Sequence, residues 1–164
     1  MKKIIVTGGL GFIGSNLIDL LIKKNFSVIN IDKISYSSNF YNLKEYNNSN
    51  KYKFIRCNIG ERKFKKILFK YKPICIFNLA AETHVDRSID NPEHFVQSNI
   101  VGVYKLLEYF KEYSQKFTSK LIHISTDEVY GDILKGRTSE KYPYNPSSPY
   151  AASKAASDHL VQSY

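Results

Sequence analysis

The chain has 164 residues, of which 43% are hydrophobic, and this length and composition predict one globular domain with a single core. Its formal net charge is +9, but the sequence contains no motif that reads nucleic acid, so we expect no nucleic-acid partner. No apolar run reaches the roughly 18 residues of a membrane span, so we expect no membrane partner. The two cysteines and four histidines lack metal-ligand spacing, so we expect no metal site. The N-terminal stretch MKKIIVTGG is interpreted as a first strand and not as a signal peptide, so we expect a cytoplasmic location.

Short β-rich segments alternate with helical patterns along the chain, which is typical of βαβ units around a parallel sheet. Strands are predicted at Lys3–Thr7, Ser27–Asp32, Lys53–Arg56, Ile74–Asn78 and Lys120–Ser125. Helices with apolar residues at helical spacing are predicted at Ile13–Lys24, Glu61–Tyr71 and Pro92–Tyr113, and loops at 34–50 and 132–147. We therefore predict a Rossmann-type doubly wound α/β sheet with strand order 3-2-1-4-5 and helices on both faces.

A final helix is predicted from Pro149, because Ser148 is a good helix cap and proline suits the first helical position. The helical pattern shows no stop signal before Tyr164, where the sequence ends. We therefore expect residues 1–164 to be the N-terminal part of a longer protein.

The stretch TGGLGFIG, after the first predicted strand, places Gly8, Gly11 and Gly14 at the start of a helix. Glycines there permit a tight turn and the close approach of a pyrophosphate, which a helix N-terminus attracts. Asp32, at the end of the second predicted strand, can accept hydrogen bonds from both hydroxyls of an adenosine ribose and repels a 2′-phosphate. The pattern therefore predicts NAD as the cofactor, although Lys33 favours NADP.

Tyr150 and Lys154 are four residues apart in YAASK and share one face of the final predicted helix. A tyrosine is a poor base at neutral pH, but the lysine cation and a positively charged nicotinamide ring would lower the pKa of its phenol. Tyr150 is thus a candidate base for a substrate hydroxyl and Lys154 its cationic partner, as in a short-chain dehydrogenase/reductase.

Four stretches carry a more specific resemblance: TGGLGFIGSNL, AAETHVDRSIDNPEHFVQSNIVGVYKLLE, ISTDEVYGD and YPYNPSSPYAASKAASDHLV. They resemble the N-terminal half of the dTDP-glucose 4,6-dehydratase family, within the extended short-chain dehydrogenases/reductases (the NAD-dependent epimerase/dehydratase family). The resemblance implies an NAD-binding Rossmann domain at residues 1–164, with the family's C-terminal substrate-binding part beyond them. It also implies an enzyme that oxidises a nucleotide sugar, eliminates water and returns the hydride.

The resemblance gives a role to the acidic pair in ISTDEVYG, which follows a strand predicted to be buried. It implies that Asp127 is the acid for the departing C6 hydroxyl and Glu128 the base for the C5 proton. Thr126 is implied to bind the substrate. Because neighbouring residues of an extended chain point to opposite sides, the two carboxylates are expected to address two different atoms of one sugar.

The resemblance also assigns a set of residues to NAD, some of which were already singled out above. They are Phe12 and Ile13; Asp32, Lys33, Ile34 and Ser35; Asn58 and Ile59; Leu79, Ala80, Ala81, Glu82 and Thr83; and Ser98, together with Tyr150 and Lys154. Thr83 is also implied to contact the substrate. Asn58 departs from the family, which has an aspartate there that accepts from the adenine amino group; we expect the asparagine carbonyl to accept that bond without charge.

The sequence leaves three interpretations open. The resemblance favours dTDP-glucose as the substrate of a homodimeric dehydratase, with a UDP-sugar as the alternative. An epimerase or decarboxylase of the same superfamily is the second interpretation, and it predicts that Asp127 and Glu128 are dispensable. The third is an NAD-binding module without turnover, which the abrupt end at Tyr164 favours.

Overall fold

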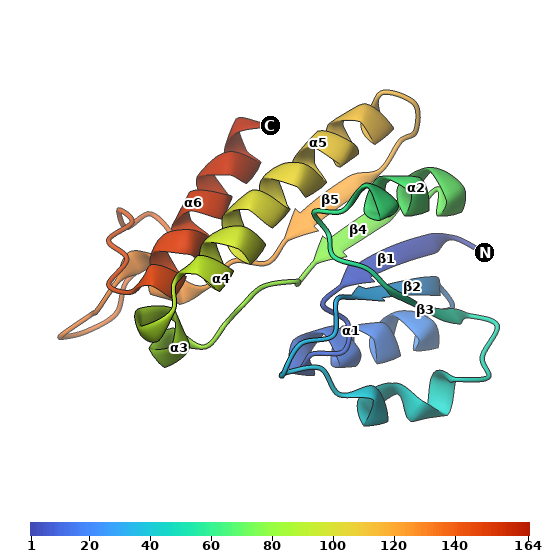
Figure 1. Ribbon diagram of the computed structural model, residues 1–164, viewed down its shortest axis with the longest axis horizontal. Helices are drawn as coiled ribbons and strands as arrows, with labels where there is room; N and C mark the ends of the chain where they lie inside the picture. The colour runs from blue at the N-terminus through green and yellow to red at the C-terminus, as the bar shows by residue number, and fades with distance from the viewer. The chain divides into compact units, whose positions relative to one another are not determined.

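Five parallel strands form one sheet in the order β3-β2-β1-β4-β5, as predicted (Figure 1). The strands are β1 (Lys3–Thr7), β2 (Ser27–Asp32), β3 (Tyr52–Arg56), β4 (Cys75–Asn78) and β5 (Lys120–His123). This computed structural model describes all residues from 1 to 164, which divide into two compact units. The first comprises Met1–Ala80 and Lys105–Ile124, and the second comprises Ala81–Tyr104 and Ser125–Tyr164.

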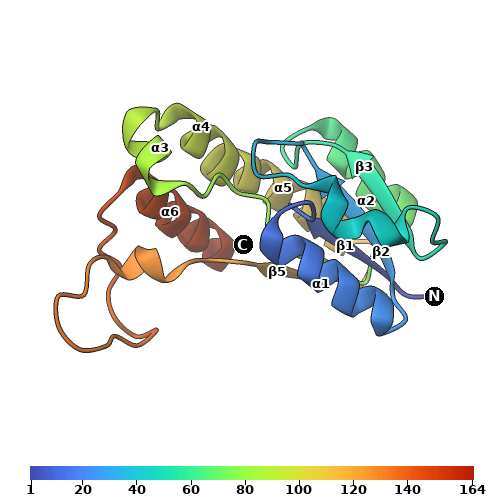
Figure 2. The ribbon, with the colours of Figure 1, turned by 90° about the horizontal axis from the view of Figure 1, so that it is seen from below.

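The first unit consists of the sheet and the helices that cover it. Strands β1 and β2 read as nearly continuous apolar runs, because parallel strands are covered on both faces. Helix α1 (Phe12–Lys23) covers one face, and α2 (Arg62–Tyr71) and most of α5 (Gly102–Ser114) cover the other (Figures 1 and 2). Phe64 and Leu106, on α2 and α5, are fully buried. No helix of the chain combines the length and the apolar character that crossing a membrane requires.

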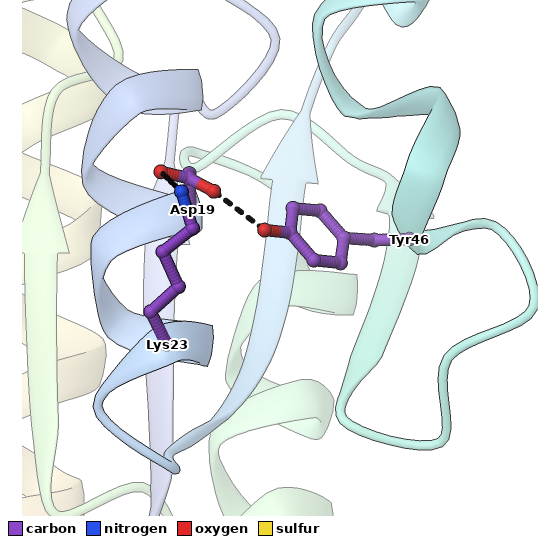
Figure 3. A network of polar contacts seen from close by, with 3 residues as sticks. All are labelled: Asp19, Lys23 and Tyr46. Atoms are coloured by element: carbon purple, nitrogen blue, oxygen red, sulfur yellow. Dashed lines mark hydrogen bonds and ion pairs between the residues drawn. The ribbon is translucent and has the colours of Figure 1, made fainter.

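The connection after β2 folds back onto α1 through the short helix η1 (Phe40–Tyr46). Leu43 is buried in the core beside α1, and the phenol of Tyr46 donates a 2.5 Å hydrogen bond to Asp19 (Figure 3). Lys23 donates to the other oxygen of the same carboxylate at 2.8 Å. The bond from Lys23, followed by that from Tyr46, lowers the pKa of Asp19, and the bond to Asp19 raises the pKa of Tyr46 to about 12. The loop that follows β2 is thereby fastened to the first helix.

The second unit is helical. It contains α3 (Val85–Asp90), α4 (Glu93–Phe95), the π-helix η2 (Val96–Val101), the start of α5, η3 (Asp127–Tyr130) and α6 (Pro149–Ser163). Helix α6 begins as predicted, since the Ser148 side chain accepts a hydrogen bond from the N–H of Ala151 and Pro149 takes the first helical position. The helix packs against α3, α4, η2 and η3.

Several elements differ from the sequence predictions. The single helix predicted at Pro92–Tyr113 is α4, η2 and α5 in succession, because Asn99 is held by the chain after β4 and the backbone widens to π-helical spacing around it. Helix α3 was not predicted, since six residues are too few to show a helical period. Strand β5 ends at His123 and is a partly exposed edge strand of the sheet, so the acidic pair does not follow a buried strand.

Candidate active site

The loop between β1 and α1 is packed so tightly that several of its positions admit only glycine. Gly8 has φ +67°, and a side chain there would come within 2.8 Å of the Leu79 backbone. A Cβ on Gly14 would lie 2.3 Å from the Gly8 carbonyl oxygen. A Cβ on Gly9 would lie 2.1 Å from Oδ1 of the buried Asn30, which explains the extra glycine of this motif.

The same loop leaves an open position at the start of α1. No side chain caps this helix, and its first turn contains no acidic residue. A Cβ on Gly11 would meet only the Gly8 carbonyl oxygen, at 3.3 Å, while Phe12 and Ile13 are 82% and 62% exposed. The backbone N–H groups and the dipole of a helix start suit a pyrophosphate. The residues present therefore fit the dinucleotide that the sequence predicts.

Asp32 lies at the end of β2 and beside the glycine loop, as predicted. Its buried carboxylate accepts hydrogen bonds from the N–H of Leu10 at 3.1 Å, the N–H of Ile34 at 2.8 Å and the hydroxyl of Ser38 at 2.9 Å. The bond to Ile34 holds that β-branched residue at φ +64°, a strained conformation. These three hydrogen bonds hold the loop in place. A carboxylate can accept about four hydrogen bonds, so Asp32 retains about one acceptor position for a ribose hydroxyl. The loop also contains the half-buried Lys33 and Ser35.

A line of hydrogen bonds that the sequence analysis missed crosses the ends of β1, β4 and β5. The Thr7 hydroxyl donates to Oδ1 of Asn78 at 2.6 Å, and Nδ2 of Asn78 lies 2.9 Å from Nδ1 of His123. An amide nitrogen only donates, so Nδ1 of His123 accepts and the ring proton is on Nε2. Thr7 also accepts from the N–H of Ala80 at 3.3 Å. These bonds fix the predicted cofactor segment after β4, and only the strand register could have revealed them.

Asn58 follows β3, and the backbone already orients its side-chain amide. Its Oδ1 accepts a hydrogen bond from the N–H of Gly60 at 3.0 Å. The oxygen that we expected to meet the adenine amino group therefore has one acceptor position taken and one left, and the amide nitrogen points away from this bond. The contact with adenine stays a prediction. Ile59, the next predicted cofactor residue, is buried.

The second unit begins with three predicted cofactor residues, Ala81, Glu82 and Thr83. Oδ1 of the buried Asn99 accepts from the N–H of Glu82 at 2.9 Å, and its Nδ2 donates to the Glu82 carbonyl and to the Ser153 hydroxyl, both at 2.9 Å. Thr83 is exposed beyond this clamp, and Ser98 precedes Asn99 in η2. The sequence analysis did not identify Asn99. The one signal that could have indicated it is a polar residue among the apolar positions of a predicted helix.

The predicted catalytic residues of the second unit gather around Tyr150. This residue is 7% exposed in the first turn of α6, and its ring packs edge-on against Phe95, with 6.3 Å between the centroids. Burial raises the pKa of the phenol, a hydrogen bond with Thr126 lowers it, and the charges of Glu128 and Asp127 raise it again. The pKa of Tyr150 is thus raised in the chain by itself, because desolvation is the largest of these effects. The lowering that we expected depends on a positively charged nicotinamide ring beside the phenol and stays a prediction.

The acidic pair does not lie in extended chain, so the predicted reason for its two directions is wrong. Asp127 and Glu128 open the 3₁₀ helix η3, which the extended Thr126 caps. The Thr126 hydroxyl accepts from the N–H of Glu128 and donates to Oδ1 of Asp127, both at 3.4 Å. Successive residues of a 3₁₀ helix point about 120° apart. Both carboxylates are exposed and still point in different directions, while the buried Val129 anchors the turn.

Lys154 is 3% exposed and follows Tyr150 by one turn on the same face of α6. Burial lowers the pKa of its ammonium to about 8, and the charge of Asp158 acts in the opposite direction. The lysine is therefore close to losing its proton in weakly basic solution.

The predicted residues thus form one group in each unit. The glycine loop, Asp32 and Asn58 belong to the first, and Thr126, Asp127, Glu128, Tyr150 and Lys154 to the second. No group of His, Cys, Asp or Glu side chains among residues 1–164 is arranged to hold a metal ion. The Rossmann-type sheet, the uncapped glycine-rich helix start and the Tyr–Lys helix define a dinucleotide-binding chain of the short-chain dehydrogenase/reductase class.

Comparison with known proteins narrows this class. The family model described as GDP-mannose 4,6 dehydratase matches residues 5–164, and the chain belongs to that family. A dTDP-glucose 4,6-dehydratase of Haemophilus influenzae is 49% identical to it, over 100% of this chain and 52% of the relative. This similarity confirms the resemblance that the motifs predicted. The chain spans about half the length of the curated relatives it matches.

Solved structures agree in fold. The dTDP-glucose 4,6-dehydratase DesIV of Streptomyces venezuelae, with NAD bound, is similar with a TM-score of 0.91 and 35% identity, covering 99% of this chain and 51% of its own. A UDP-glucose 4-epimerase of Thermus thermophilus, in complex with NAD, is similar with a TM-score of 0.87 and 30% identity, covering 99% and 50%. The fold alone therefore does not distinguish dehydratases from epimerases. The distinction has to come from the side chains of the site.

Proposed function

We propose that the protein is an NAD-dependent nucleotide-sugar 4,6-dehydratase, a hydro-lyase that converts dTDP-glucose to dTDP-4-keto-6-deoxyglucose. The observation that carries the proposal is the gathering of Thr126, Asp127 and Glu128 at the buried phenol of Tyr150. Oxidation of a sugar hydroxyl needs one base, and elimination of water needs a second base and an acid. The curated relatives, which are named dTDP-glucose 4,6-dehydratases, support dTDP-glucose as the substrate.

Residues 1–164 would act as the NAD-binding domain. The start of α1 would hold the pyrophosphate, and Asp32 would accept from a ribose hydroxyl and repel a 2′-phosphate, which favours NAD over NADP. When bound, NAD supplies the acceptor, and later the donor, of one hydride. A homodimer and a cytoplasmic location remain predictions for the whole protein.

The side chains divide the proton transfers among them. Tyr150 takes the proton of the C4 hydroxyl as the hydride leaves C4, and the ammonium of Lys154 favours the phenolate that this step requires. Glu128 removes the C5 proton, which the C4 ketone has made acidic, and Asp127 protonates the departing C6 oxygen, which leaves as water. Protonated Glu128 would then return the proton to C5 as C6 receives the hydride that bound NAD would supply. Thr126 binds the sugar hydroxyl beside Tyr150.

Variants of these residues in the full-length protein should fail at different stages. Tyr150→Phe lacks the base for oxidation, so adding dTDP-glucose should produce no reduced cofactor. Asp127→Asn and Glu128→Gln keep that base and should form reduced cofactor and then stall, with product formation about 10²–10⁴-fold slower. Single-turnover absorbance of the reduced nicotinamide, followed by product analysis, separates these outcomes.

Glu140→Gln is the matched control, because Glu140 is an exposed carboxylate in the loop after η3 and has no role in the proposed steps. It should react as the wild type does. Release of 4-keto-6-deoxy sugar at the normal rate by the Asp127 and Glu128 variants would make the acidic pair structural and favour the epimerase interpretation.

A further inference from the structure

A third ionisable side chain continues the line of Tyr150 and Lys154 along α6, and the proposed reaction does not use it. Asp158 stands four residues after Lys154, as Lys154 stands four after Tyr150. On an α-helix these spacings place all three on one face, with a rise of roughly 6 Å at each step. Asp158 is 7% exposed, so its carboxylate is buried like the lysine.

Hydroxyl donors hold the Asp158 carboxylate in place. The Ser125 hydroxyl donates to its Oδ2 through a short hydrogen bond, and the phenol of Tyr144 donates to the same oxygen at 3.2 Å. The Tyr144 ring is itself fixed between the rings of Tyr130, at 5.4 Å, and His159, at 5.3 Å. Burying a carboxylate is costly unless it is hydrogen-bonded, and donors to its oxygens favour the charged form. The cluster therefore holds the carboxyl group of Asp158 in a fixed place one turn beyond the lysine.

We propose that Asp158 is a positioning residue that keeps the buried ammonium of Lys154 protonated, so that Lys154 can act on Tyr150. Only the action of Lys154 on Tyr150 rests on the proposed function. The link between Asp158 and Lys154 follows from their burial, their helical spacing and the hydroxyls that hold the carboxylate.

The electrostatics of α6 show that Asp158 favours the charged form of the lysine. Burial lowers the pKa of Lys154 to about 8, and the charge of Asp158 counters this effect. Asp127 and Glu128, on the adjoining η3, act on Tyr150. The pKa of Tyr144, which faces Asp158, is raised by burial and by that carboxylate. The other charged groups on the helices packed against α6 are exposed, namely Asp86, Arg87, Asp90, Glu93 and His94.

The test is a direct titration of Lys154 in the full-length protein. With ¹³C-labelled lysine, the ε-carbon resonance of Lys154, assigned by its loss in Lys154→Met, reports the protonation midpoint. Asp158→Asn keeps the size of the side chain and its ability to accept from both hydroxyls, and it should lower that midpoint by roughly one pH unit. Asp158→Glu restores a charge nearby and should recover most of the loss. If Asp158→Asn does not fold, Asp158→Ser has the same expectation.

Two controls define the outcome. Tyr144→Phe keeps the charge and should move the Lys154 midpoint by less than half of the asparagine effect; a larger shift, or an unchanged midpoint in Asp158→Asn, would overturn the inference. Under the proposed function, formation of reduced cofactor by Asp158→Asn should decline at lower pH than in the wild type. A shifted midpoint in a protein that never reduces its cofactor would instead reject the proposed function and leave the coupling of Asp158 to Lys154 standing.

Discussion

The side-chain oxygen of Asn58 accepts from the N–H of Gly60, and this bond leaves the amide nitrogen and one acceptor position of the oxygen for a ligand. In the proposed mode of binding, the pyrophosphate lies at the end of β1 and the ribose at the end of β2, so the base extends toward β3, which Asn58 follows. The amide nitrogen is a donor, which suits a ring nitrogen of adenine and not its amino group.

Asn58→Asp should therefore change which purine is preferred. A carboxylate can keep the bond to Gly60 and accept from the adenine amino group with its second oxygen. The preference for NAD over nicotinamide hypoxanthine dinucleotide, which lacks that amino group, should rise roughly tenfold. Isothermal titration calorimetry with both dinucleotides measures it, and Asn48→Asp, at an exposed asparagine, should leave the ratio unchanged. An equal ratio in the wild type and Asn58→Asp would mean that the base does not reach this residue.

At the scale of the element, the π-helix η2 places Asn99 where its amide pairs with both backbone groups of Glu82. Asn99→Ala removes these bonds and leaves a peptide N–H and C=O without partners, so the free energy of unfolding should fall by roughly 2–4 kcal/mol. Urea denaturation of the chain measures the change. Gln97→Ala, at an exposed position of the same π-helix, should change stability by less than about 0.5 kcal/mol. Equal losses in the two variants would show that the clamp on Glu82 contributes nothing.

The elements that the sequence predicted are those whose signals are local. The apolar runs of β1 and β2, the glycines at the start of α1 and the Ser148–Pro149 start of α6 each appear within a few residues. The dinucleotide-binding pattern of a Rossmann-type sheet then predicts the strand order. The 3₁₀ turn of the acidic pair also had a local signal, since Thr126 precedes two acidic residues as a helix cap does.

The contacts that were missed join residues far apart in the sequence. Thr7 and Asn78 are 71 residues apart, Asn99 and Ser153 are 54 apart, and Ser125 and Asp158 are 33 apart. No periodicity marks such pairs, because each depends on strand register or helix packing. The raised pKa of Tyr150 has the same origin, since its main cause is burial, which the sequence does not show.

At the scale of the whole molecule, the buried ammonium of Lys154 lowers stability at neutral pH. Its pKa is about 8 in the folded chain and close to 10.5 when unfolded, so the unfolded chain binds more protons between these values. The free energy of unfolding should therefore rise with pH through this window. Lys154→Met should be more stable than the wild type at pH 7, by at most about 3 kcal/mol, and its advantage should vanish as the pH approaches 10.5.

Urea denaturation of both proteins at several pH values isolates this effect, because groups common to both cancel in the difference. Lys135→Met, at an exposed lysine, should show no such pH-dependent difference from the wild type. A constant difference between Lys154→Met and the wild type from pH 7 to pH 10.5 would mean that Lys154 titrates alike in both states.

The equal spacing of Tyr150, Lys154 and Asp158 along α6 also constrains how this chain can change over generations. A substitution alters one of the three groups and leaves the others in line. An inserted or deleted residue between Tyr150 and Asp158 turns everything beyond it by about 100°, so at least one of the three groups leaves the shared face. Descendants of this chain can therefore exchange amino acids within the stretch, but a change in its length would end the alignment of all three side chains at once.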